Sequence, residues 1–188
     1  MKKFFCFFFI LTMTTTAFAS VPKPAVYGKV LLSQTTPVTV SDTVSYGNDS
    51  WENYSVQFTI TLSGKSAFDN QSHTLLYFRS LRPGSGYAMR INDVHSGLSF
   101  YRVDEGTFTW LDSYPKLLAP DESLSLHIDL YEDKITVFVA TGTYPYFQQP
   151  AIQITDPSYP KGGILFTKPA VYSDMVLEQV FVKELLQN

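Results

Sequence analysis

The chain has 188 residues, of which 45% are hydrophobic, 15% aromatic and only 16% charged, with a formal net charge of −3. This length corresponds to one domain and is sufficient to bury a core without the help of disulfides. The acidic balance excludes nucleic acid and anionic lipid as favoured partners, because both are bound through clustered positive charge.

The first nineteen residues have the pattern of a signal peptide. Met1-Lys2-Lys3 is a basic start, Phe4 to Met13 is apolar, and Ala17-Phe18-Ala19 offers small residues for cleavage before Ser20. The apolar run is too short to cross a bilayer as a helix, and no later window is long enough, so no membrane span is expected. We therefore predict export to the periplasm or the exterior of a bacterial cell, with residues 20–188 as a single β-sandwich domain.

Alternation of apolar and polar residues predicts β-strands throughout the rest of the chain. The clearest run, Tyr54 to Ser63, places apolar side chains on one side and hydroxyl or amide groups on the other. Further strands are predicted at 26–32, 37–40, 74–80, 86–91, 97–103, 107–111, 123–131, 134–140, 151–155, 163–166 and 175–182. Residues 174–186 also allow an amphipathic helix, but their β-branched content favours a closing strand. Short strands separated by Gly, Pro, Asn and Asp predict an all-β, antiparallel two-sheet jelly-roll sandwich.

The parity of the central strands predicts a polar face that carries aromatic rings. The core side is expected to hold Leu76, Phe78, Tyr87, Met89, Ile91, Leu98, Phe100, Phe108 and Trp110. The opposite side then collects Tyr77, Arg79, Arg90, Ser99, Tyr101, Thr107 and Thr109. Planar donors, hydroxyls and stacking rings are what the recognition of a sugar requires.

An aromatic loop at residues 143–150 adds a second candidate surface. Its Tyr144 and Tyr146 stand between prolines on a connection between strands. These rings are suited to stack on a sugar or to contact a protein partner, and packing over the sandwich edge is an equal alternative.

Four segments in order carry a resemblance to a known family. They are Trp51-x-x-Tyr54-x-Val56-x-Phe58, Leu75-Leu76-Tyr77-Phe78-Arg79, Gly86-Tyr87-Ala88-Met89-Arg90-Ile91 and Leu98-x-Phe100-Tyr101-Arg102. This order is similar to the concanavalin A-like lectin/glucanase superfamily, especially its laminin G-like and levan-type carbohydrate-binding modules. The resemblance implies two curved sheets that hold a saccharide on the concave face or at the rim loops. It also implies ligand-binding roles for Arg79, Tyr87 and Arg90, which match the motif positions of the family.

The motifs of catalysis are missing from the sequence. The glucanase pattern E-x-D-x-x-E and the nucleophile pattern Gly-x-Ser-x-Gly do not occur. His73, His95 and His127 lie too far apart in sequence for a typical zinc site. A non-catalytic role is therefore favoured, although a sugar hydrolase without a short signature stays open.

Calcium is the one cofactor that the pattern leaves open. Asp156 lies in a loop rich in Pro and Gly, and lectin-like sandwiches often hold a structural calcium ion with loop oxygens. The favoured alternative is that Asp156 caps a turn.

The sequence thus predicts an exported, non-catalytic carbohydrate-binding module whose partner is a polysaccharide or other glycan. The predicted ligand-binding residues are Tyr77, Arg79, Tyr87, Arg90, Tyr101, Tyr144 and Tyr146. The main alternative is a protein-interaction or structural β-sandwich of the cell surface or of a secretion system.

Overall fold

A computed structural model describes residues 26–64, 73–80, 82, 84–93, 97–119, 121–140, 149–170 and 172–186 of the chain. Within these ranges thirteen strands form two antiparallel sheets, and no helix occurs. The predicted all-β, two-sheet sandwich is therefore confirmed. The same ranges contain no helix with the length and apolar character needed to cross a bilayer.

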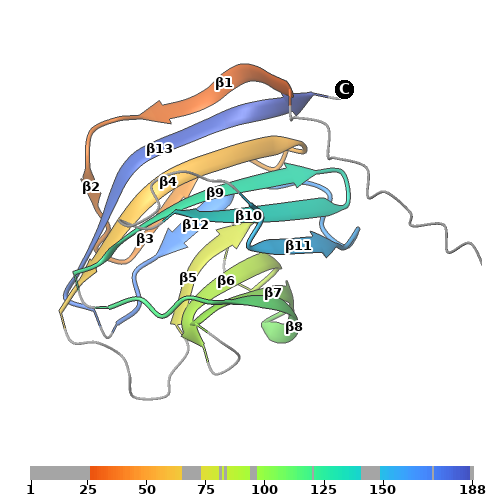
Figure 1. Ribbon diagram of the computed structural model, residues 1–188. Coiled ribbons are helices and arrows are strands. Elements are labelled where there is room, and N and C mark those ends of the chain that lie inside the picture. Colours follow the sequence, from red (N-terminus) through yellow and green to blue (C-terminus); the bar gives the residue numbers. More distant parts are fainter. Residues whose placement is uncertain are drawn as a thin grey trace, which may run out of the picture.

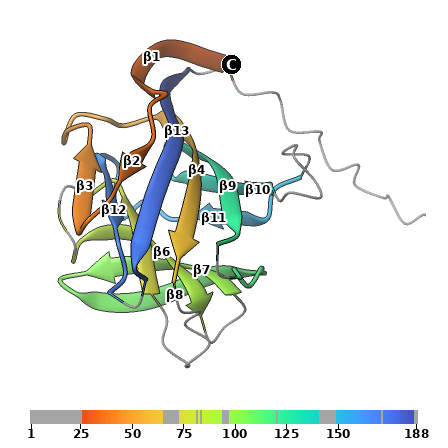
Figure 2. The same cartoon turned by 90° about the vertical axis from the view of Figure 1, so that its left-hand side faces the viewer.

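Sheet A has the strand order β1-β13-β4-β9-β10-β11, and β2 pairs with β13. Its strands are β1 (Val26–Gln34), β2 (Val38–Thr39), β4 (Tyr54–Ser63), β9 (Ser123–Tyr131), β10 (Lys134–Ala140), β11 (Ile152–Thr155) and β13 (Asp174–Leu186). The closing segment is thus the predicted strand and not a helix. It lies between β1 and β4, where Figure 2 shows it running beside β4.

Sheet B has the order β3-β12-β5-β6-β7-β8. Its strands are β3 (Thr43–Tyr46), β5 (His73–Phe78), β6 (Gly86–Asp93), β7 (Gly97–Asp104), β8 (Thr107–Pro115) and β12 (Ile164–Thr167). Figure 1 shows the meander β5 to β8 as a layer beneath the strands of sheet A. Because four consecutive strands pair in sequence order, their side chains of equal parity share one face.

The core lies between the two sheets, as the parity of β4 predicts. Tyr54, Val56, Phe58, Ile60 and Leu62 are all fully buried. Rings from both sheets meet there: the Phe58 ring lies edge-on to that of Phe166 with centroids 4.9 Å apart. Burial of one such side chain stabilises the fold by about 1.5 to 3 kcal/mol, so this strand anchors sheet A on sheet B.

The side chains of strand β8 point to the opposite faces of the sheet from those predicted. Phe108 and Trp110 lie opposite Val103 and Tyr101 in the pairing with β7, so they share the outward face of those residues. Trp110 is 46% exposed, whereas the next residue, Leu111, packs against the main core. The prediction that the two rings belong to the core is therefore wrong. Their alternation with threonine shows that they share a face, but not which face.

Candidate functional site

The candidate site is the outer face of sheet B, the side of β5 to β8 and β12 that points away from sheet A. Its side chains are Thr74, Tyr77, Ala88, Arg90, Ser99, Tyr101, Val103, Phe108, Trp110 and Leu165. Several of them form a cluster of their own, separate from the main core. The predicted face with Tyr77, Arg90 and Tyr101 therefore exists, and it is more aromatic than predicted.

The Arg90 guanidinium is held against two rings of this outer face. Its Cζ lies 3.8 Å from the ring centroid of Phe108 and 4.9 Å from that of Tyr101. Its Nε donates a hydrogen bond to Thr74 Oγ1 at 3.3 Å. Cation–π contacts contribute from about 0.5 to 2 kcal/mol each, depending on desolvation. The planar donor group is thus fixed in orientation by the protein before any ligand arrives.

A buried carboxylate stands next to these rings. The Tyr101 hydroxyl donates to Asp93 Oδ2 at 2.6 Å, and Asp93 is 5% exposed. Burial raises the pKa of Tyr101 to about 12, and the hydrogen bond and the charge of Asp93 act in the same direction, whereas Arg90 opposes them. Tyr101 is therefore a neutral donor at physiological pH. The face thus carries a hydrogen-bond donor in Arg90 and an acceptor in Asp93. Recognition of sugar hydroxyls needs both, because a hydroxyl donates and accepts.

A buried hydroxyl without a partner lies opposite Arg90. Ser99 pairs with Arg90 across β6 and β7, and its Oγ has no hydrogen-bond partner among the described residues. Buried hydroxyls in native folds normally have a hydrogen-bond partner, and a water molecule or a ligand hydroxyl could be the partner of this one.

The rings of the outer face differ strongly in exposure. Tyr77 is 6% and Tyr101 5% exposed, whereas Trp110 is 46% exposed. The tyrosines expected to stack on a sugar are thus mostly covered, and Trp110 presents the larger ring surface. Tyr144 and Tyr146 lie outside the described residues.

Sequence reasoning missed Trp110, Phe108 and Asp93 as parts of this face. For the two rings the signal was present, since both alternate with threonine in β8. For Asp93 there was none, because a register shift between β6 and β7 breaks strict alternation just before it.

Arg79 does not lie on the outer face, which corrects the prediction. Strand β5 ends at Phe78, and Arg79 follows it with a φ of 47°, so the parity of the strand no longer applies. Its side chain, in a residue that is 2% exposed, donates to the carbonyl oxygens of Glu132 at 2.6 Å, Tyr159 at 3.0 Å and Glu52 at 3.0 Å. The guanidinium thereby joins sheet B to loops and a turn of sheet A.

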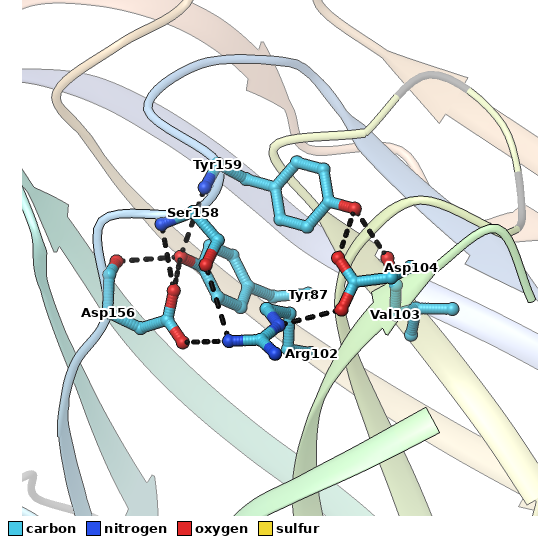
Figure 3. A network of polar contacts seen from close by, with 7 residues as sticks. All are labelled: Tyr87, Arg102, Val103, Asp104, Asp156, Ser158 and Tyr159. Atoms are coloured by element: carbon cyan, nitrogen blue, oxygen red, sulfur yellow. Dashed lines mark hydrogen bonds and ion pairs between the residues drawn. The ribbon is translucent and has the colours of Figure 1, made fainter. Parts of the chain in front are cut away.

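Tyr87 is a core residue with a polar end, and Asp156 is its partner. The Tyr87 hydroxyl lies 2.7 Å from the carbonyl oxygen of Asp156 and 3.0 Å from its Oδ1. The same carboxylate accepts from the backbone N–H of Ser158 and from Arg102 Nη1 at 3.2 Å (Figure 3). Tyr87 is fully buried, so it cannot contact a ligand in this conformation.

The same network continues to the end of β7. The Tyr159 hydroxyl donates toward the Val103 carbonyl oxygen and Asp104 Oδ1, both at 2.8 Å, and Arg102 Nε donates to Asp104 Oδ2 at 2.8 Å. Residues from three segments thus hold the loop after β11 against β7.

Asp156 does not fit the calcium site that the sequence left open. Its carboxylate already accepts hydrogen bonds from a phenol, a backbone amide and a guanidinium, and the positive guanidinium would repel a cation. In the part of the chain that the structure describes, no three His, Cys, Asp or Glu residues come together to hold a metal ion. The network acts as a cap for the loop.

The Asp156 network predicts a loss of stability in acid. Burial raises the pKa of the carboxyl, but hydrogen bonds from Ser158, Tyr87 and Arg102 outweigh it, so the pKa lies below the ordinary 3.8. A depressed pKa stabilises the fold above the ordinary value, and this contribution disappears as pH falls through the folded-state pKa. We expect Asp156→Asn to lower the free energy of unfolding by about 1 to 2 kcal/mol at pH 6, and by much less at pH 3.

Urea unfolding of both proteins at the two pH values measures this difference. The exposed Asp49, changed to Asn, is the matched control, and its effect on the free energy of unfolding should not differ between the two pH values. If Asp156→Asn lowers the free energy of unfolding equally at pH 6 and pH 3, the stabilising role of the ionised Asp156 carboxylate is contradicted.

No family model matches this chain, and neither does any curated protein. Solved structures do resemble it. A carbohydrate-binding module from Bacillus subtilis has a TM-score of 0.54 at 12% identity, over 83% of this chain and 94% of that one. The exoplasmic/lumenal domain of VIP36, in its Ca²⁺/Man2-bound form, has a TM-score of 0.55 at 10% identity, over 78% and 72% of the two chains.

The fold is that of the concanavalin A-like lectins. A xylan β-1,4-xylosidase from Bacillus halodurans shares the concanavalin A-like fold with a TM-score of 0.51 at 12% identity. The match covers 70% of this chain but only 28% of the xylosidase, so it concerns a part of that enzyme.

Proposed function

We propose that this protein is a non-catalytic carbohydrate-binding module and that the outer face of sheet B binds the glycan. The observation that carries the proposal is the Arg90 guanidinium fixed on the Phe108 ring, on the same face as the exposed Trp110. A sugar ring has one apolar face of C–H groups and a rim of hydroxyls, which match an indole surface and a planar donor. Since the protein holds the donor in place, little side-chain freedom is lost on binding.

The structural neighbours support this choice of ligand. One is described as a carbohydrate-binding module, and another was solved with Man2 bound. At 10% to 12% identity they support the proposal through the fold alone, so the specific saccharide must come from experiment.

Export is the second part of the proposal. The basic start, the apolar run and the small residues before Ser20 support a cleaved leader and a module that acts in the periplasm or outside the cell. There it would meet polysaccharide.

A glycan array with the purified protein and its variants tests the proposed site. Trp110→Ala and Arg90→Ala are each expected to weaken binding at least about tenfold, since a central ring or arginine in an interface contributes about 1.4 kcal/mol or more. Thr109→Ala is the matched control, because this exposed neighbour in β8 points to the other side of the sheet. If no glycan binds, or if both variants bind as the original protein does, the proposal is wrong.

A protein partner is the second candidate function, and the edge strand β1 favours it. Val26, Tyr27 and Val30 are 41% to 56% exposed there, and Leu186 at the end of β13 is 45% exposed. An exposed apolar edge can pair with a strand of another chain. A negative glycan array together with co-purification of a protein that is lost on changing Val30 to Lys would favour this function.

A further inference from the structure

A hollow lies on the outer face of sheet A, on the other side of the molecule from the proposed glycan site. Its volume is about 230 Å³, and it is lined by Tyr27, Ser55, Gln57, His127, Phe181 and Lys183. These side chains come from the adjacent strands β1, β13, β4 and β9. The hollow is smaller than the roughly 300 to 1,000 Å³ of pockets for larger ligands, so its size suits a single ring.

Ser55 and His127 line this hollow, and Asp129 contacts His127 beside it, but the three residues are not a catalytic triad. Ser55 Oγ lies 3.0 Å and Asp129 Oδ1 2.8 Å from the same nitrogen, Nε2 of His127. A triad requires the serine and the carboxylate on different ring nitrogens. The cluster is therefore an arrangement for hydrogen bonding.

The position of the protons follows from these partners. Asp129, as a carboxylate, only accepts, so Nε2 of His127 carries the hydrogen and donates it to Oδ1. The Tyr27 hydroxyl, 3.3 Å from the same Nε2, cannot then donate to it. Burial, and next to it the charge of Asp129, raises the pKa of Tyr27, so the phenol keeps its proton. That proton is available to an acceptor in the hollow.

The remaining lining residues add further donors and a ring surface. Lys183 Nζ lies 5.6 Å from the centroid of the Tyr27 ring, which is 43% exposed. Gln57 presents an amide at the exposed side of β4, and Phe181 adds a second ring. Phenol, amide and ammonium together offer donors and one positive charge, and the nearby Asp129 accepts a hydrogen bond from His127. An acceptor-rich anion with a ring to stack is the matching ligand.

We infer that this hollow binds a carboxylate-bearing sugar residue, a hexuronic acid of an acidic glycan, with Lys183 and Tyr27 facing the carboxylate. The hydroxyls of the sugar ring would meet Gln57 and Ser55. This site is independent of the outer face of sheet B and of the glycan proposed there.

Chemical-shift titrations of the purified protein with methyl glucuronide, methyl glucoside and benzoate test the inference. Methyl glucuronide is expected to shift amides of β1, β4, β9 and β13 saturably, and to bind about twofold to fivefold more tightly than the neutral glucoside, the size of one partly exposed charge pair. Benzoate, which lacks the hydroxyls, should bind more weakly. Equal affinity for the two glycosides, or tighter binding of benzoate, would overturn the choice of ligand.

Two variants locate the site. Lys183→Met and Tyr27→Phe should each weaken glucuronide binding severalfold without moving the shifts of sheet B. Lys134→Met, which removes an exposed lysine of β10 outside the hollow, is the control. Trp110→Ala should leave glucuronide binding unchanged, so a failure of the glycan proposal is separable from a failure here. Glucuronide shifts confined to sheet B, or unchanged by Lys183→Met, would refute the site.

Discussion

Replacing Arg79 with alanine is expected to lower the free energy of unfolding by about 3 kcal/mol or more. The buried guanidinium donates to the carbonyl oxygens of Glu52, Glu132 and Tyr159, which belong to three separate connections. Without it those carbonyls lose a charged donor in a site that water reaches poorly. The variant should therefore loosen the contact between the two sheets at this end of the sandwich.

Thermal unfolding measures the effect, which for a chain of this size corresponds to a fall in Tm of about 6 to 12 °C. Arg79→Lys should recover little of the stability that Arg79→Ala loses, because one ammonium group cannot reach three carbonyls as the planar guanidinium does. The exposed Arg82, changed to alanine, is the control and should stay within about 0.5 kcal/mol. An Arg79→Ala protein that keeps its stability but no longer binds glycan would restore the original prediction of a ligand-binding arginine.

Gly162→Ala is expected to destabilise the fold by about 4 kcal/mol or more, or to prevent folding. Gly162 has a φ of 136°, which side-chain-bearing residues rarely adopt. A Cβ there would lie 2.3 Å from the carbonyl carbon of Arg79 and 2.7 Å from the backbone N of Ser80. Because these are backbone atoms of buried residues, they cannot move aside as a flexible side chain would.

Gly106→Ala separates the clash from the backbone strain. Gly106 has a φ of 85°, but nothing lies within 4 Å of a Cβ placed there. This variant should lose only about 1 to 2 kcal/mol, the strain of the left-handed conformation alone. Urea unfolding of both variants gives the comparison, and equal losses would show that the close approach of Gly162 to Arg79 has no energetic weight.

The fold could be predicted from the sequence because apolar and polar residues alternate clearly in its strands and its turns carry the expected residues. The inner face of Tyr54–Ser63 was predicted residue by residue, and the closing strand was chosen correctly over a helix. Strand Thr43–Tyr46 was not predicted from the sequence. Long-range pairing with β12 defines this strand, and a local pattern does not contain that information.

The candidate site could be predicted from the sequence only in part, for three physical reasons. Parity states which side chains share a face, but the opposite orientation of Trp110 follows from the register of β8 against β7. Parity also ends where a strand ends, so the left-handed Arg79 turned inward although its neighbours obeyed the rule. Exposure is a third property that alternation omits: Tyr77 and Tyr101 point outward and are still nearly covered.

The pairing of β1 with β13 also determines how the domain responds to mechanical load. Val26 lies opposite Leu186, so the outer ends of the first and last strands are neighbours at one end of sheet A (Figure 1). Tension applied at these two residues would open the pair like a zipper, one hydrogen bond at a time, instead of shearing all of them together. Peeling of this kind needs little force. A polysaccharide that pulls on the faces of the sheets would load the interior strands instead, where the bonds resist as a group.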